Sequence, residues 1–202
     1  MNCNLIQVGS HIGNTSNDYI FNNITLNGLC IFIEPVEEYF NTLKENYNKK
    51  YPDNNFLFFN IACSDVNHTL TLYKPIVDDK SPLWANQLTS VLPNHAKNHN
   101  INVGLNPIEI QAKTLNTVIS ENNIDSIDIL AVDTEGYDYE VLQGIDLDKI
   151  KPKEIIFEHK HIDGTNQSFG FKYYKLINHL FSKNYELIKQ TEDDTYMKLR
   201  NG

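Results

Sequence analysis

Residues 127–144 read IDILAVDTEGYDYEVLQG, and this stretch decides the fold. Ile127 to Val132 is an almost continuous apolar run, which predicts a strand buried on both faces. The run stops at the polar turn Asp133-Thr134-Glu135-Gly136, and Tyr137 to Leu142 follows as a predicted helix. A buried strand that leads through a polar turn into a helix is the repeating unit of a parallel sheet with crossover helices.

The same strand-to-helix unit occurs twice nearer the start of the chain. Leu5 to Val8 is an apolar run that stops at a glycine, and Leu29 to Ile33 is another that stops at an acid. Apolar positions between residues 36 and 47 then recur at helical spacing, and Phe56 to Ile61 is a third apolar run. This order predicts a β-α-β-α-β arrangement with right-handed crossovers.

The alternation of strands and helices is interrupted in the second half of the chain and then resumes. Residues 74–106 contain scattered prolines and no sustained period, so we expect a long excursion from the sheet. Lys153 to Phe157 predicts a further buried strand, an apolar stripe over 173–181 predicts a helix, and residues 185–199 predict a terminal hairpin. Together these elements predict a Rossmann-like, doubly wound α/β sheet in a single domain, residues 1–202.

The composition excludes several classes of protein. The chain has 202 residues, 17 basic and 26 acidic, for a net charge of −9, which disfavours a nucleic-acid partner. No apolar run approaches the roughly 20 residues of a membrane span, and the start has no signal-peptide pattern, so we expect a soluble, cytoplasmic protein. The three cysteines are widely spaced and odd in number, which favours reduced core residues over disulfides or zinc.

In a sheet of this kind, ligands bind at the carboxyl ends of the strands. Turn glycines or polar residues stand at each predicted strand end. They are Gly9-Ser10-His11-Ile12-Gly13, Glu34-Pro35, Asn60-Ile61-Ala62, Asp133-Thr134-Glu135-Gly136 and Glu158-His159. We therefore expect one site built from these five segments.

The first two strand ends predict a nucleoside pocket. Glycine lets the backbone pass close to a ligand, and Glu34 on the neighbouring strand can accept both hydroxyls of a ribose. The glycines are spaced G-x-x-x-G, with Ser10 in place of the second glycine of the dinucleotide fingerprint G-x-G-x-x-G. This spacing offers no pyrophosphate site and favours a nucleoside cofactor without one, S-adenosylmethionine being the obvious example.

Five segments of the chain, in order, resemble the FkbM-type S-adenosylmethionine-dependent methyltransferases. They are QVGSHIGNTS from Gln7, IEPVEEYF from Ile33, NIACSD from Asn60, TLNTVISENNIDSIDILAVDTEGYDYEVLQGI from Thr114 and KPKEIIFEH from Lys151. The resemblance implies a class I methyltransferase fold, in which the last of seven strands is antiparallel, and the terminal hairpin agrees with it. Members of this family methylate hydroxyl oxygens of macrolides and sugars.

The resemblance also implies roles for the residues at the strand ends. It implies that the methionine part of the cofactor contacts Gln7, Gly9, Ser10, His11, Gly13, Asn14, Thr15 and Ser16. The ribose would contact Glu34, beside Pro35, and the adenine would contact Asn60, Ile61 and Ala62. Gln7 stands where the family usually has an acid, and His11 where asparagine is common. Since an uncharged amide binds an ammonium group less strongly than a carboxylate does, we expect a weaker contact with the methionine amino group.

Methyl transfer to a hydroxyl requires that the acceptor oxygen be aligned with the sulfonium methyl group and lose its proton. The candidate catalytic residues are Asp133, Glu135, Glu158 and His159, because they end two strands that we expect to be neighbours. Our hypothesis is that Asp133 and either Glu158 or His159 contact the acceptor hydroxyl, directly or through a divalent metal ion. The alternation of His159 and His161 is more typical of a solvent-facing strand end than of a metal cluster.

These features favour an S-adenosylmethionine-dependent O-methyltransferase for a small-molecule or glycan acceptor, a sugar or similar polyhydroxylated compound, with residues 74–106 as a lid over it. Two alternatives stay open: a nicotinamide-dependent oxidoreductase, and a catalytically inactive nucleoside-binding domain of the same fold. The short segment before the first strand is consistent with a minimal catalytic domain or with one domain of a longer glycan-building polypeptide. The sequence leaves open which sugar and hydroxyl are used, whether a metal is required, and the oligomeric state.

Overall fold

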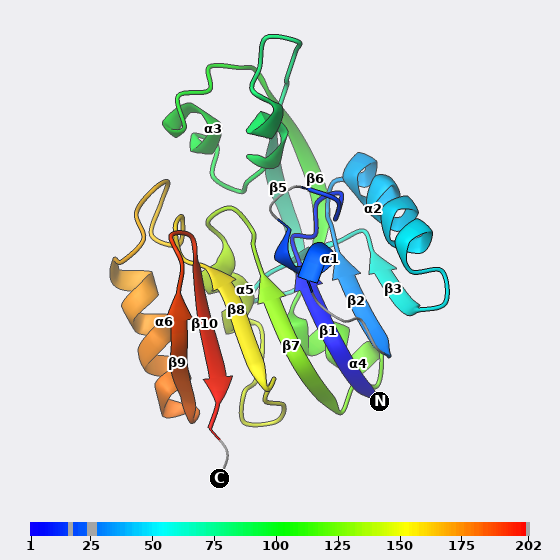
Figure 1. Ribbon diagram of the computed structural model, residues 1–202. Helices are drawn as coiled ribbons and strands as arrows, with labels where there is room; N and C mark the ends of the chain where they lie inside the picture. Colours follow the sequence, from blue (N-terminus) through cyan, green and yellow to red (C-terminus); the bar gives the residue numbers. More distant parts are fainter. Residues whose placement is uncertain (16–17, 24–27, 201–202) are drawn as a thin grey trace.

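The computed structural model describes residues 1–15, 18–23 and 28–200, and its centre is a seven-stranded sheet (Figure 1) in the order β3-β2-β1-β7-β8-β10-β9. The strands are β1 (Asn2–Val8), β2 (Leu29–Ile33), β3 (Asn55–Phe59), β7 (Ser126–Val132), β8 (Glu154–Glu158), β9 (Tyr185–Gln190) and β10 (Asp194–Leu199). The first five pair in parallel, whereas β10 runs antiparallel to both β8 and β9. The predicted doubly wound sheet with an antiparallel last strand is therefore confirmed.

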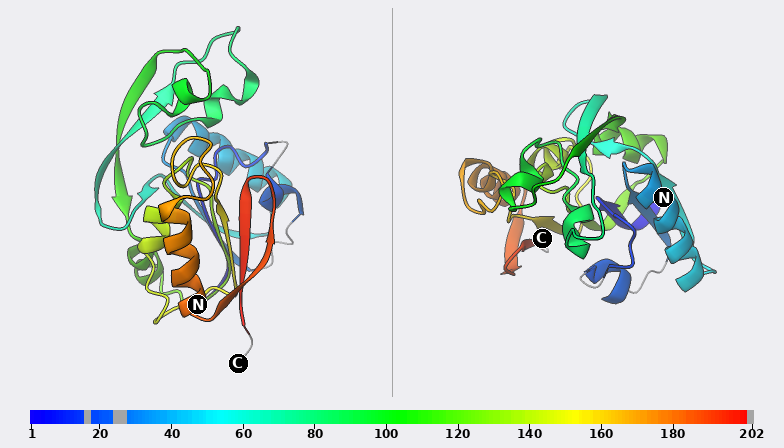
Figure 2. Two further views of the ribbon diagram at one scale, coloured as in Figure 1. Left: turned by 90° about the vertical axis from the view of Figure 1, so that its left-hand side faces the viewer. Right: turned by 90° about the horizontal axis from the view of Figure 1, so that it is seen from above.

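Helices cover the sheet on two faces (Figure 2). Helices α4 (Leu115–Glu121), α5 (Asp138–Gln143) and α6 (Phe171–Ser182) pack on one face, and their apolar side chains join those of the central strands in the larger core cluster. Helices α1 (Tyr19–Asn23) and α2 (Glu37–Lys50) pack on the other face in a second cluster. All five residues of β2 are buried, as a strand with helices on both sides requires.

The register of the parallel strands aligns their carboxyl ends. Val8 of β1 pairs with Ile33 of β2 and with Val132 of β7, and Val132 pairs in turn with Phe157 of β8. The residues that follow these four are Gly9, Glu34, Asp133 and Glu158. Four of the predicted strand ends therefore meet at one edge of the sheet.

The excursion that the sequence predicts is an ordered layer above this edge, at the top of Figure 1. Strands β5 (His68–Pro75) and β6 (Leu105–Lys113) form a long antiparallel pair, and β4 (Ala62–Cys63) joins β6 to complete a three-stranded sheet. Between β5 and β6 lie the 3-10 helix η1 (Leu83–Gln87) and the short helix α3 (His95–Asn98). The sequence did not predict these two helices, which enclose a small core of Ala85, Leu88, Ala96 and Ile101.

The longest helix of the described residues is α2, with 14 residues. Among those residues, no helix has the length and apolar character that crossing a bilayer demands.

Candidate active site

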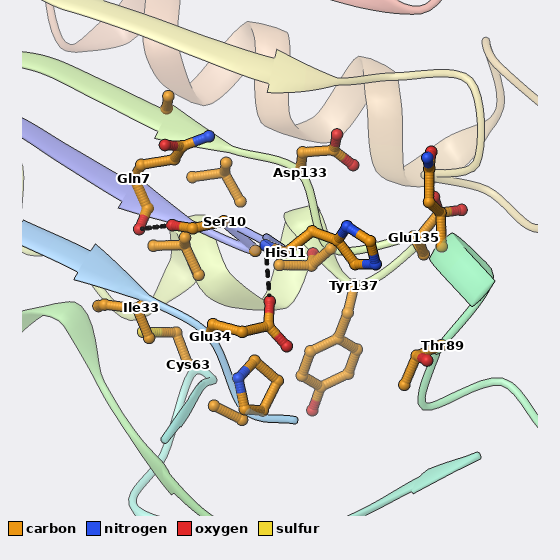
Figure 3. A pocket seen from close by; sticks show the side chains of 18 of the residues that line it. Gln7, Ser10, His11, Ile33, Glu34, Cys63, Thr89, Asp133, Glu135 and Tyr137 are labelled. Atoms are coloured by element: carbon orange, nitrogen blue, oxygen red, sulfur yellow. Dashed lines mark hydrogen bonds between the residues drawn. The ribbon is translucent and has the colours of Figure 1, made fainter. Parts of the chain in front are cut away.

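A pocket opens at the carboxyl edge, between the ends of β1, β2 and β7 (Figure 3). Its shape depends on Gly9, where the turn after β1 passes close to the end of β7. A Cβ atom at position 9 would lie 1.7 Å from the carbonyl oxygen of Asp133, and Gly9 has a φ of +79°. Only glycine fits this position, because both the space and the left-handed backbone exclude a side chain.

Glu34, at the end of β2, lines this pocket and is held by two backbone amides. The His11 amide donates to Oε2 and the Val36 amide to Oε1, both at 2.8 Å. Burial raises the pKa of Glu34 to about 7, although the two hydrogen bonds act in the opposite direction. Each oxygen keeps a second lone pair, so the carboxylate can accept hydrogen bonds from two adjacent hydroxyls of a ligand.

Gln7 and Asp18 line the same pocket from β1 and from the start of α1. The Gln7 side-chain amide donates to Asp18 Oδ2 at 3.4 Å, and the amide of Phe21 donates to Asp18 Oδ1 at 2.8 Å. Burial raises the pKa of Asp18. Sequence reasoning missed Asp18, because an acid before a helix reads as a cap. The pocket thus contains a carboxylate beside the uncharged Gln7.

Five acids line a second cavity under the excursion: Asp133, Glu135, Glu158, Asp193 and Asp194. Asp133 and Glu135 line the first pocket as well, so the two cavities meet at these side chains. Burial raises the pKa of Glu135 to about 8. Burial and the charge of Glu135 raise the pKa of Asp133, and burial and the charge of Asp133 raise the pKa of Glu158. A carboxylate with a raised pKa is a stronger base once ionised.

His159 lies apart from these acids, although it follows Glu158 directly. Its Nδ1 atom is 3.0 Å from Thr195 Oγ1, its ring stacks on Phe169 with centroids 4.9 Å apart, and it also contacts Tyr173. Adjacent residues at a strand end point to opposite faces, which separates the two side chains. The structure therefore brings Asp133, Glu135 and Glu158 together but does not bring His159 to either cavity.

The other predicted cofactor residues divide into two groups. Ser10, His11, Thr15, Pro35, Ile61 and Ala62 line the first pocket. Gly13, Asn14 and Asn60 do not: the Asn60 amide group donates to the carbonyl oxygens of Glu34 and Pro35, both at 2.9 Å, and so holds the end of β2. Ser16 lies outside the described residues.

The sequence of this chain matches the model of a known protein family. The family model described as "Methyltransferase FkbM domain" matches residues 7–187. The chain belongs to the FkbM methyltransferase family. The predicted family is therefore confirmed, and S-adenosylmethionine as the cofactor agrees with it. No curated protein sequence is significantly similar to this FkbM chain.

The chain is similar to solved structures of methyltransferases. A methyltransferase FkbM from Methylobacillus flagellatus superposes with a TM-score of 0.58 at 13% identity, over 98% of this chain and 44% of that one. This FkbM chain thus spans less than half the length of that protein. A precorrin-6y C5,15-methyltransferase from Geobacter metallireducens gives a TM-score of 0.43 at 12% identity over 98% and 80% of the two chains. TrmK of M. capricolum, with bound S-adenosyl-homocysteine, gives 0.44 at 11% identity over 98% and 61%.

Three histidines lie beside Glu135 in this FkbM-family chain. His95 and His99 come from α3 and its end, and His161 from the loop after β8; all three surround Glu135. His95 Nε2 lies 2.8 Å from Glu135 Oε2. Sequence reasoning placed His95 and His99 in an excursion without structure, although their i, i+4 spacing in HAKNH is the signal for two rings on one face of a helix.

Proposed function

We propose that this FkbM-family protein is an S-adenosylmethionine-dependent O-methyltransferase that acts on a hydroxyl of a sugar or similar polyhydroxylated acceptor. The observation that carries the proposal is that Asp133 and Glu135 line both cavities. A ligand in the first pocket and a ligand in the second would therefore meet at these two carboxylates. Transfer of a group between two ligands needs such a junction.

The first pocket has the chemistry that S-adenosylmethionine needs. Glu34 offers two oxygens to the ribose hydroxyls, and Ile61 and Ala62 offer an apolar border to the adenine. Asp18 supplies a carboxylate for the ammonium group of the methionine part, beside Gln7, where other members of the family usually have an acid. Gly9 lines this pocket with backbone alone, where a side chain would clash with the carbonyl oxygen of Asp133.

The second cavity has the chemistry of a sugar site. Its acids are hydrogen-bond acceptors for hydroxyl groups, and Trp84, whose side chain is 45% exposed, can stack on the apolar face of a sugar ring. The one lysine that lines it, Lys160, pairs with Asp193 at 2.7 Å. A cavity lined by five acids and one lysine offers an anionic acceptor little cationic charge, which favours a neutral acceptor.

The protein's part in the reaction is to hold the acceptor hydroxyl and to take its proton. S-adenosylmethionine supplies the electrophilic methyl group. Asp133 is placed to accept the hydroxyl proton, and its raised pKa makes it a better base than a fully hydrated carboxylate. Glu158, the neighbouring strand end, holds the acceptor, while His159 has no part in this arrangement because it faces away.

Calorimetric titration with S-adenosylhomocysteine, followed by a screen of neutral sugars with labelled cofactor, tests the proposal. Asp133→Asn should lower turnover by about 10²–10⁴-fold, the usual contribution of a general base, and change the dissociation constant of S-adenosylhomocysteine less than about threefold. Asp53→Asn, at an exposed position far from the site, is the matched control. Undiminished turnover in the Asp133 variant would refute the assignment of the base. Binding of a nicotinamide cofactor instead would favour the oxidoreductase, and cofactor binding without turnover on any acceptor would favour the inactive domain.

A further inference from the structure

Three imidazole rings form a regular triangle next to Glu135. The ring centroids of His95, His99 and His161 are each 4.8 Å from the other two, and the ring planes are steeply inclined to one another at 67°, 84° and 83°. One ligating atom from each histidine and one from Glu135 all lie within 4.8 Å of each other. Imidazoles that share one ion through bonds of about 2.1 Å adopt a similar spacing.

His95 directs one ring nitrogen at Glu135, and His99 has a ring nitrogen without a partner among the described residues. His95 Nδ1 lies 3.1 Å from Thr165 Oγ1, which can fix the ring proton on Nδ1 and leave Nε2 unprotonated toward Glu135. His99 Nε2 is buried and has no hydrogen-bond partner among the described residues. A buried polar atom without a partner is costly, and a bound cation would remove that cost.

His161 differs from the other two. The amide of Asn166 donates to its Nδ1 at 3.0 Å, so the proton of the neutral ring lies on Nε2. That nitrogen lies 3.5 Å from Glu158 Oε1 and 3.8 Å from Glu135 Oε2. The protonated Nε2 of His161 therefore faces the two acids, and His161 does not offer a lone pair to an ion while the bond from Asn166 holds.

We propose that His95, His99 and Glu135 bind one divalent transition-metal ion of the class that prefers imidazole ligands, Zn²⁺ or Fe²⁺. Two imidazoles and one carboxylate leave coordination positions free, and this set borders the second cavity through His99 and Glu135. Asp133 and Glu158 line the same cavity and would offset the charge of the ion. An open position there faces the space assigned above to the acceptor hydroxyl.

The experiment is equilibrium titration of chelator-treated protein with Co²⁺, followed by visible absorption, and with Zn²⁺, followed by calorimetry. We expect one ion per chain and visible absorption bands of protein-bound Co²⁺. Glu135→Gln, which keeps an oxygen for His95, and His99→Gln should each weaken Zn²⁺ binding at least tenfold. His68→Gln and His179→Gln, on β5 and α6 away from the site, are the matched controls and should not change binding.

Circular dichroism melting of each variant checks that the fold is retained. Failure of the wild-type protein to bind one equivalent, or binding that Glu135→Gln and His99→Gln leave unchanged, would overturn the site. A role for the ion in activating the acceptor rests on the proposed function, so S-adenosylhomocysteine binding is measured on the same samples. Loss of that binding in metal-free and metal-loaded protein alike would count against the proposed function, and the metal titration would still decide the metal site.

Discussion

The backbone amide of His11 donates a 2.8 Å hydrogen bond to Oε2 of Glu34, and this bond joins the turn after β1 to the end of β2. His11 has a φ of +46°, a left-handed conformation that is uncommon for a residue with a side chain. The turn that begins at Gly9 thus directs an amide toward a buried carboxylate of the neighbouring strand. This contact fixes the position of the carboxylate in the pocket, where we propose that it binds the ribose of the cofactor.

The raised pKa of Glu34 predicts that cofactor binding depends on pH. The ionised carboxylate accepts hydrogen bonds from two hydroxyls, whereas the protonated group loses one acceptor site. Because the pKa of Glu34 is about 7, affinity for S-adenosylhomocysteine should fall severalfold as pH falls from 8.5 to 5.5. Calorimetric titrations across this range measure the effect. The Glu34→Gln variant should bind S-adenosylhomocysteine more weakly and should lose the part of the pH dependence that Glu34 causes. Parallel pH profiles for the wild type and this variant would contradict the prediction.

Asp18 is predicted to bind the ammonium group of the cofactor in place of an acid at position 7. Asp18→Asn keeps an oxygen that can accept the Phe21 amide proton, so α1 should still form, but it removes the charge. We expect a loss of about 1–2 kcal/mol, or roughly 5- to 30-fold in affinity for S-adenosylhomocysteine. Adenosine, which lacks the amino acid part, is the control ligand and should bind both proteins equally. An equal loss for both ligands would indicate a structural effect instead.

Gly9→Ala tests the close approach of the β1 and β7 turns. The added methyl group would clash with the carbonyl oxygen of Asp133, and the backbone would remain in the left-handed region. We expect the free energy of unfolding to fall by about 2–4 kcal/mol, which lowers Tm by roughly 5–15 °C. Gly104→Ala is the matched control, since its Cβ would meet only the flexible end of the Ile76 side chain at 3.3 Å. Equal Tm values for the two variants would disprove the steric argument.

The hydrogen bonds of Ser90 suggest a test of how residues 74–106 contribute to the site. Its buried hydroxyl donates to the carbonyl oxygen of Glu135 at 2.8 Å and accepts from the Leu92 amide at 3.1 Å, so it ties the excursion to the loop after β7. If residues 74–106 act as a lid, Ser90→Ala should raise the KM for the acceptor by about 3- to 10-fold and leave S-adenosylhomocysteine affinity unchanged.

The control for Ser90 is Ser81→Ala, in the same excursion. The Ser81 hydroxyl bonds to the exposed Asp78, away from both cavities, so steady-state kinetics of this variant should match the wild type. A loss of cofactor affinity in Ser90→Ala, with no change in the acceptor KM, would show that the excursion supports the first pocket and is not a lid.

The fold and the cofactor end of the site could be predicted from the sequence because they depend on local patterns. An apolar run that ends in a glycine or an acid defines a parallel strand and its end together, and parallel strands bring these ends to one edge. Gly9, Glu34 and Asp133 line one pocket, as these strand ends predict. The spacing of the glycines, which favours a nucleoside over a pyrophosphate, is a local pattern of the same kind and stays a prediction.

The tertiary structure alone decided which side chains join across long separations. Glu158 and His159 are adjacent in the sequence, and only the orientation of β8 sends the first toward Asp133 and the second against Phe169. His95 and His99 reach Glu135 because β5 and β6 pair outside the main sheet and carry α3 back over its edge. Such contacts depend on the packing of whole elements, which no short sequence pattern encodes, whereas the strand ends depend only on where hydrophobic burial stops.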